Sequence, residues 1–163
     1  MLEIRLARSA DFEKIWPIFH EIVSAGETYA YARDTNQDQG FQLWMTLPRQ
    51  TFVIEENGEI LGSYFIKTNQ SGGGDHVCNC GYMVSSQARG RGVASMMFAH
   101  SQNIAKDLGY LAMQFNFVVS TNESAVRLWT QCGFDTVGRL PKAFHHPAHG
   151  LVDALIMYKW LAN

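Results

Sequence analysis

The residues whose chemistry is easiest to interpret lie in segment 84–94, which reads Val-Ser-Ser-Gln-Ala-Arg-Gly-Arg-Gly-Val-Ala, with an apolar run on either side. Gly90 and Gly92 allow the backbone to turn tightly and to approach a ligand closely, while Arg89 and Arg91 add positive charge. A strand-to-helix turn of this kind exposes backbone N–H groups at the positive end of the helix dipole. The segment therefore predicts an anion site suited to a pyrophosphate. The alternative is a turn that carries two solvated arginines.

Two other phosphate-binding loops have requirements that this segment does not meet. A dinucleotide fingerprint needs G-x-G-x-x-G near the first strand and an acidic residue about 20 positions later. Here Ser95 occupies the third glycine position, and the segment lies in the middle of the chain. A P-loop needs Gly-Lys followed by Ser or Thr, and that pattern is absent.

Length and composition limit the classes of protein to consider. The chain has 163 residues, which suggests one domain over residues 1–163. It is 47% hydrophobic and 17% charged with a net charge of −2, so nothing in its charge suggests nucleic acid as a partner. No apolar run approaches the roughly 18 residues of a membrane span, and the N-terminus lacks the pattern of a signal peptide. Three cysteines without a secretory context suggest reduced thiols in the cytoplasm.

Hydrophobic periodicity predicts the elements that must position the anion site. An apolar stripe from Ile15 to Val23 predicts a first helix, and Phe41–Trp44 a short second one. The segment 141–150 is expected to be a loop. Strands are predicted over 2–6, 51–55, 60–68, 77–84, 111–119, 134–139 and 153–160, and further helices over 92–108 and 123–131. This order predicts a mixed α+β fold.

A second pattern lies downstream and reads Asn122-x-x-Ala125-x-x-x-Trp129-x-x-x-Gly133-Phe134. Together with Q-x-x-G-x-G in the first segment, it resembles the GCN5-related N-acetyltransferase (GNAT) family, as does the order of elements along nearly the whole chain. The resemblance implies the GNAT fold, in which helices flank a mixed, mostly antiparallel central sheet. It also implies acetyl-CoA as cosubstrate. Family members often pair through late strands, so we expect a homodimer with 151–160 as the apolar edge strand.

The resemblance also implies which residues hold acetyl-CoA. Backbone groups of Met83 and Val84 would hold the pantetheine arm and donate toward the thioester oxygen, a contribution of about 3–4 kcal/mol for each such donor. Backbone N–H groups of residues 89–94 would wrap the pyrophosphate. Asn122 would hydrogen-bond the cofactor arm, and Ala125 would leave room for it. The implied cofactor-binding residues are Met83, Val84, Gln87, Arg89, Gly90, Arg91, Gly92, Val93, Ala94, Asn122, Ala125 and Trp129.

Trp129 departs from the family pattern, which often has a tyrosine there to protonate the leaving thiolate. An indole N–H donates a hydrogen bond but cannot supply a proton. Trp129 could therefore stabilise the thiolate by hydrogen bonding, or it could simply fill the wall of the site. In either case water could protonate the thiolate.

Several polar residues are candidates for binding the amine acceptor. Glu27 lies in the loop that borders the acceptor site in this family, where a carboxylate could bind an ammonium or accept its proton through water; otherwise it is a solvated loop residue. Asn116 and Asn79 interrupt apolar strands, so each either binds acceptor or makes a structural hydrogen bond. Asp153 lies in a Gly-x-x-Asp-x-x-x-Met pattern, which resembles the phosphinothricin-type and proline-analogue-type acetyltransferases. Asp153 therefore either binds acceptor or makes hydrogen bonds to the loop before it. The candidate acceptor-binding residues are Glu27, Tyr29, Asn79, Asn116 and Asp153; the candidate catalytic residues are Glu27, Asn116 and Met83.

The expected function is N-acetyl transfer from acetyl-CoA directly to a small amine, amino acid or imino acid. One alternative is a protein N-terminal or lysyl acetyltransferase, and another is a non-catalytic acyl-CoA-binding module. No metal site is expected, because the alternating His76, Cys78 and Cys80 lack a fourth ligand and the usual finger spacing. No membrane partner is expected either.

Overall fold

The computed structural model describes residues 1–163, which form seven strands and four α-helices. The helices are α1 (Phe12–Ala25), α2 (Gln37–Phe41), which continues as a π-helical turn over Gln42–Thr46, α3 (Val93–Asp107) and α4 (Glu123–Gln131). The strands are β1 (Glu3–Leu6), β2 (Gln50–Glu56), β3 (Glu59–Thr68), β4 (Val77–Val84), β5 (Ala112–Val119), β6 (Asp135–His146) and β7 (Gly150–Trp160). No helix has the length and apolar character needed to cross a membrane.

All seven strands belong to one sheet, in the order β1-β2-β3-β4-β5-β7-β6. Every neighbouring pair is antiparallel except β4 and β5, which run parallel. The α+β class and the mixed, mostly antiparallel sheet expected from the sequence are therefore confirmed.

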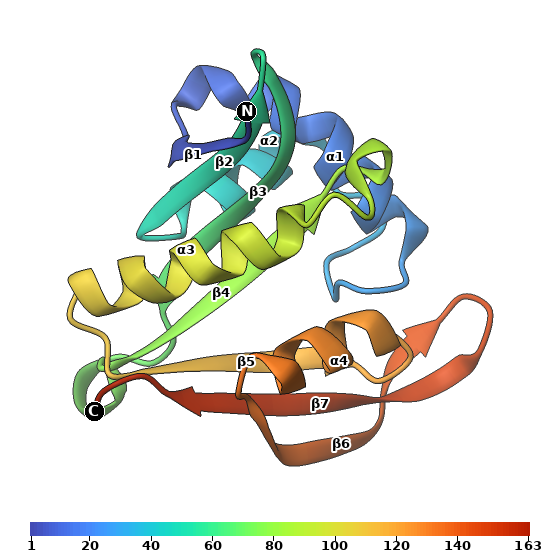
Figure 1. The fold of residues 1–163 in the computed structure, drawn as a ribbon. Coiled ribbons are helices and arrows are strands. Elements are labelled where there is room, and N and C mark those ends of the chain that lie inside the picture. The colour runs from blue at the N-terminus through green and yellow to red at the C-terminus, as the bar shows by residue number, and fades with distance from the viewer.

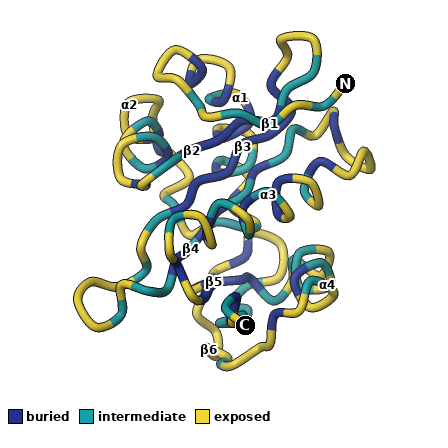
Figure 2. Tube along the Cα trace, turned by 60° about the vertical axis from the view of Figure 1, so that its left-hand side comes forward, coloured by how far each residue is buried: buried dark blue, intermediate teal, exposed yellow.

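The helices cover both faces of the sheet. α3 and α4 lie on one face, in front of the sheet in Figure 1, and α1 and α2 lie behind it. Each face has its own apolar core: one includes Met97, Phe98 and Trp129, and the other includes Phe19 and Trp44. The buried residues follow the middle strands of the sheet, as Figure 2 shows, so these strands form a rigid frame for the site.

The C-terminal hairpin differs from the sequence-based expectation in two ways. The expected loop over 141–150 is mostly strand, because β6 runs to His146 and β7 begins at Gly150. The pairing shifts register between Leu140 and Phe144, where Lys142 has a left-handed φ of 53°. A bulge of this kind on an edge strand accommodates Pro141, which has no N–H to donate. The expected edge strand was also wrong, because β7 lies between β5 and β6, and β6 forms the edge.

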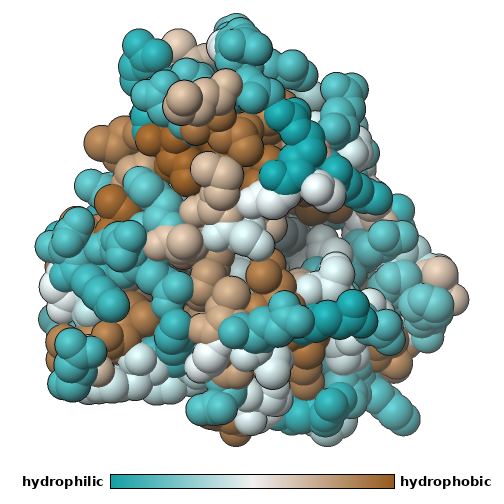
Figure 3. Space-filling view, in the orientation of Figure 1, coloured by the Kyte–Doolittle hydropathy of each residue, from teal (hydrophilic) through white to brown (hydrophobic).

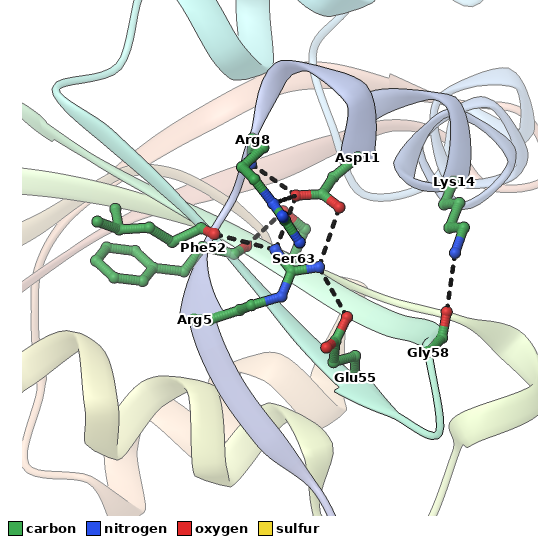
Figure 4. Close-up of polar contacts among 9 residues, drawn as sticks. Arg5, Arg8, Asp11, Lys14, Phe52, Glu55, Gly58 and Ser63 are labelled. Atoms are coloured by element: carbon green, nitrogen blue, oxygen red, sulfur yellow. Dashed lines mark hydrogen bonds and ion pairs between the residues drawn. The ribbon is translucent and has the colours of Figure 1, made fainter.

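An ion-pair network ties the N-terminal strand to the start of α1. Arg5 lies between two carboxylates, as Figure 4 shows, with Nη1 2.8 Å and Nη2 3.0 Å from the oxygens of Asp11, and Nη2 2.8 Å from Oε2 of Glu55. The backbone N–H of Arg8 also donates to Asp11, at 2.6 Å. The guanidinium of Arg5 lowers the pKa of the largely buried Asp11 carboxyl from 3.8 to about 2.

This network predicts acid sensitivity. The pKa of Asp11 is lower in the folded than in the unfolded chain. Its contribution to the free energy of unfolding is therefore complete above about pH 4 and disappears as the pH falls toward 2. We expect Asp11→Asn to lower the free energy of unfolding by about 2 kcal/mol at pH 7, and the difference from the wild type to shrink over that acid range. Urea unfolding at several pH values measures this, with Asp75→Asn as an exposed control. An equal difference at pH 7 and pH 2 would contradict the role given to Arg5.

Candidate active site

The central feature of the sheet is the separation of its two parallel strands. β4 and β5 pair only at their first residues, Val77 with Ala112 and Cys78 with Met113, and then diverge as Figure 1 shows. At the point of divergence, Nδ2 of Asn79 donates to the carbonyl oxygen of Gln114 at 2.9 Å. Beyond it, a cleft of about 860 Å³ opens between the strands. The space-filling view in Figure 3 shows a hollow between the part of the molecule with α3 and the part with α4.

The divergence leaves one backbone edge of β4 without a strand partner. In an antiparallel pair, successive residues point their N–H and C=O groups alternately toward and away from the neighbouring strand. The N–H of Ser85 donates to Leu61 of β3, and the register pairs Met83 with Ser63, so the amide of Met83 faces β3. The amides of Tyr82 and Val84 therefore face the cleft.

This alternation corrects one sequence-based expectation and adds one residue. Val84 was expected to present its backbone to the cofactor and lies in position to do so. Met83 was expected to do the same, but its amide is turned to β3 and its side chain is buried in the core beneath α1. The amide of Tyr82 faces the cleft instead. The sequence offers no signal for this, because the direction of an amide depends on strand register.

The turn after β4 has the conformation that its glycines allow. Gly90 and Gly92 have φ values of 75° and 74°, in the left-handed region that favours glycine. A Cβ added at either position would meet no protein atom within 4 Å, so the space next to both residues is open. These glycines are therefore required for backbone shape, and their open side is available to a ligand.

The N-terminus of α3 faces the cleft at this turn. Val93, Ala94 and Ser95 line the cleft, the first turn of α3 has no acidic residue, and no side chain caps it. The positive end of the helix dipole is therefore not neutralised by the protein, which favours an anion there.

The two arginines of the turn have different surroundings. Arg89 is exposed, lines the cleft and makes no ion pair. The side chain of Arg91 is bound to Glu56 at the end of β2 and is absent from the cleft lining. The sequence predicted two equivalent charges at the anion site, but the structure places only Arg89 there. Gln87 begins the turn, as its N–H donates to Oγ of Ser85 at 3.3 Å, and it also lies outside the lining.

The opposite wall of the cleft comes from α4 and includes Asn122, Ala125 and Trp129. Trp129 is 8% exposed and packs among four aromatic rings, with centroid distances of 4.8 Å to Phe115, 5.1 Å to Tyr82, 5.2 Å to Phe98 and 6.4 Å to Phe134. Such contacts favour a wall-forming role over a hydrogen bond from the indole N–H to the leaving thiolate.

If Trp129 only packs, Trp129→Phe should keep kcat within about three-fold of the wild type, and Trp129→Tyr should give no gain of ten-fold or more. Steady-state kinetics at saturating acetyl-CoA measures both variants, after thermal unfolding has shown that they fold. A drop near 100-fold for the phenylalanine variant, about 2.7 kcal/mol in the barrier, would instead assign thiolate stabilisation to the indole.

The loop after α1 borders the cleft on the other face of the sheet. Glu27 and Tyr29 both line the cleft there. The side chain of Glu27 is exposed and has no hydrogen bond or ion pair. The hydroxyl of Tyr29 donates to the carbonyl oxygen of Tyr82 at 2.8 Å, and burial raises the pKa of Tyr29 well above its ordinary value. Tyr29 therefore holds the loop against β4 and cannot readily give up its proton.

The two candidate asparagines lie on the same face as this loop. Asn116 is exposed; its Nδ2 donates to Oδ1 of Asn69 at 2.6 Å and its Oδ1 accepts from Gln114 at 2.8 Å. Asn79 lines the cleft beside it while bridging to β5.

Asp153 does not join the other candidates, because it lies outside the cleft lining. Its carboxylate accepts from Arg139 at 2.7 Å and from the backbone N–H of Lys142 at 2.9 Å, which fixes the bulge of β6. The Lys142 N–H and the Arg139 guanidinium lower the pKa of this carboxyl. Of the two interpretations open at the sequence level, these contacts favour the structural one.

Comparisons with known proteins agree with this geometry. The model of the acetyltransferase (GNAT) family matches residues 12–134. N-acetyltransferase aca1 of Schizosaccharomyces pombe is 33% identical over 107 residues, which are 65% of this chain and 51% of that protein, so the chain spans about half the length of this relative. Because the family model covers most of the chain, the chain belongs to the acetyltransferase (GNAT) family.

Solved structures show the same architecture over the full length. A GCN5-related N-acetyltransferase from Kribbella flavida has a TM-score of 0.93 and 43% identity, covering 98% of this chain and 97% of that one. A phosphinothricin acetyltransferase from Sinorhizobium meliloti, solved in complex with acetyl-CoA, has a TM-score of 0.85 and 19% identity, covering 99% and 89%. At that identity the second likeness concerns the fold alone.

Proposed function

We propose that this protein transfers the acetyl group of acetyl-CoA directly to the amine of a small molecule such as an amino acid, an imino acid or a simple amine. The observation that carries the proposal is the divergence of β4 from β5. This divergence brings three features into one cleft: an anion site at the N-terminus of α3, unpaired backbone N–H groups on β4, and a polar face. We call this polar face, which includes Glu27, Tyr29, Asn79 and Asn116, the acceptor face. The pyrophosphate would occupy the turn at Gly90 and Gly92 beside Arg89, and Asn122 and Ala125 would border the pantetheine arm.

The reaction needs a neutral amine, donors for an oxyanion and release of a thiolate. The amine nitrogen attacks the thioester carbonyl carbon, which forms the C–N bond and a tetrahedral oxyanion. One of the N–H groups of β4 that face the cleft, that of Tyr82 or that of Val84, donates to the oxyanion, and such a donor contributes about 3–4 kcal/mol. The C–S bond then breaks and the CoA thiolate leaves, to be protonated by water. The proton of the amine passes through water to the carboxylate of Glu27.

A small acceptor is favoured over a protein because the acceptor face is bordered by the loop that carries Glu27 and Tyr29 and by the asparagines of β4 and β5. An extended peptide would need an open groove that pairs with its backbone. We assign acceptor binding to Glu27, Asn79 and Asn116.

The test is a comparison of kcat/KM for free amino acids, simple amines and peptides. We expect free amino-acid-like amines to be acetylated better than peptides. Asn116→Ala should lose most of this activity while binding acetyl-CoA normally by calorimetry, and Asn103→Ala on the exposed side of α3 serves as control. Preference for a peptide N-terminus or lysine would establish the protein acetyltransferase, and binding of acetyl-CoA without transfer to any amine would establish a non-catalytic module.

We also propose that the protein forms a homodimer through β6. This edge strand has 12 residues, and Val137 is 61% exposed on it. A long edge strand with apolar residues needs cover, and a second copy could supply it. Light scattering at micromolar concentration should give twice the mass of the chain, and Val137→Lys should return the monomer mass. A wild-type monomer at that concentration would refute the proposal.

A cytoplasmic location is consistent with the cysteines, since Cys78, Cys80 and Cys132 are all free thiols. We propose this location, and cell fractionation tests it: recovery of the protein outside the cytoplasm would contradict it.

A further inference from the structure

Three charged side chains line the cleft, and they divide between its two faces. Arg89 belongs to the anion turn, while Glu27 and Lys67 are the remaining two. Lys67 lies on β3 opposite Asn79 of β4, and Phe65 is two residues before it on the same face. Phe65 packs in the core on the side of α1, so Lys67 lies on the face bordered by the loop of Glu27. This face therefore holds one carboxylate and one ammonium.

Lys67 has no anionic partner within the protein. It is half-buried, and its Nζ makes neither an ion pair nor a hydrogen bond. The Nζ atom lies 5.4 Å from the centre of the Phe65 ring, a cation–π distance that holds the amine over this ring. Phe65 itself is fixed, because its ring lies over Gly81, where an added Cβ would be 2.5 Å from Phe65 Cε1. The cation is thus oriented and partly desolvated without a counter-ion, so an anion placed beside it gains more than it would in water.

We propose that Lys67 binds the carboxylate of the acceptor, and that the acceptors are zwitterionic amino or imino acids. The proposal rests on the proposed function and narrows its substrate class. The ammonium of such an acceptor faces Glu27 and its carboxylate faces Lys67, so the charges of the ligand complement those of the acceptor face. A diamine or a simple amine places no negative charge near Lys67, and a peptide N-terminus presents a neutral amide at the position of the carboxylate. Lys67 is therefore a specificity-determining residue.

The experiment compares each amino acid with its own carboxamide and its decarboxylated amine in the wild type, Lys67→Met, Lys67→Arg and Lys67→Glu. Lys67→Met should lower kcat/KM for the amino acids by about 30-fold, mainly through KM, and change the carboxamides by less than about three-fold. Lys67→Arg should retain most of the preference for the amino acid over its carboxamide. Lys67→Glu should reverse the preference, so that the decarboxylated amine becomes a better substrate than the amino acid. Because each substrate is compared between variants, differences in amine basicity among substrates cancel. Lys106→Met on α3 is the control for loss of a lysine outside the cleft.

An equal loss of kcat/KM for acids and carboxamides in Lys67→Met, each relative to the wild type, would overturn the proposal. Acetyl-CoA affinity, measured by calorimetry, should be unchanged in all variants. If the wild type acetylates no amine at all, the proposed function fails, and ligand-observed NMR of the same acids and carboxamides in the presence of CoA tests Lys67 separately. Binding of the acids that is lost in Lys67→Met supports the proposal, and equal or absent binding of acid and carboxamide refutes it.

Discussion

We expect Gly92→Asp to weaken acetyl-CoA binding at least 100-fold, which corresponds to about 2.7 kcal/mol. Gly92 is the last residue before α3, at a φ of 74°, and it adjoins the open space in front of the helix N-terminus. An aspartate there brings a negative charge and side-chain atoms into the space where the pyrophosphate would lie. It also neutralises the positive end of the helix dipole. Isothermal titration calorimetry with acetyl-CoA measures the effect.

Two further variants separate the causes of that loss. Gly92→Ala has the same backbone strain without the charge, so it should bind acetyl-CoA several-fold more tightly than Gly92→Asp. Gly72→Asp places the same side chain at a φ of 61°, also with no neighbour within 4 Å of its Cβ, but outside the cleft. It should keep wild-type affinity at a similar cost in stability. Wild-type affinity in a folded Gly92→Asp variant would show that the turn does not hold the cofactor.

The second large effect concerns Glu27. We expect Glu27→Gln to lower kcat/KM for the acceptor by about 100-fold, because general-base assistance typically contributes 10²–10⁴-fold. Glutamine keeps the shape of the side chain but cannot accept the proton of the amine. Acetyl-CoA affinity should be unchanged, since Glu27 lies on the acceptor face of the cleft. Initial rates with varied acceptor at saturating acetyl-CoA measure the loss.

Asp34→Asn is the matched control for Glu27, because it removes a carboxylate from the same exposed loop at a position outside the cleft lining. It should keep at least half of the wild-type rate. An unchanged kcat/KM for Glu27→Gln would mean that solvent alone removes the proton and that the carboxylate of Glu27 does not contribute to acceptor binding either.

Local patterns in the sequence were sufficient to determine much of this protein. The spacing of Gly90 and Gly92 between two apolar runs predicts a strand-to-helix turn, and the left-handed φ of both residues agrees with it. The period of the apolar residues predicts the order of strands and helices, because burial on one face is a local requirement of each element. The second pattern, from Asn122 to Phe134, indicates the family.

Only the tertiary structure decided how the residues of the cleft are used. Arg89 and Arg91 are equivalent in sequence, but Glu56, 35 residues earlier in the chain, binds Arg91 and leaves Arg89 for the cleft. The register with β3 turns the amide of Met83 away from the cleft and exposes those of Tyr82 and Val84. The same register places Lys67 in the site, although it is an ordinary polar position near the end of a strand. These assignments depend on contacts between distant segments, which local propensity and periodicity do not encode.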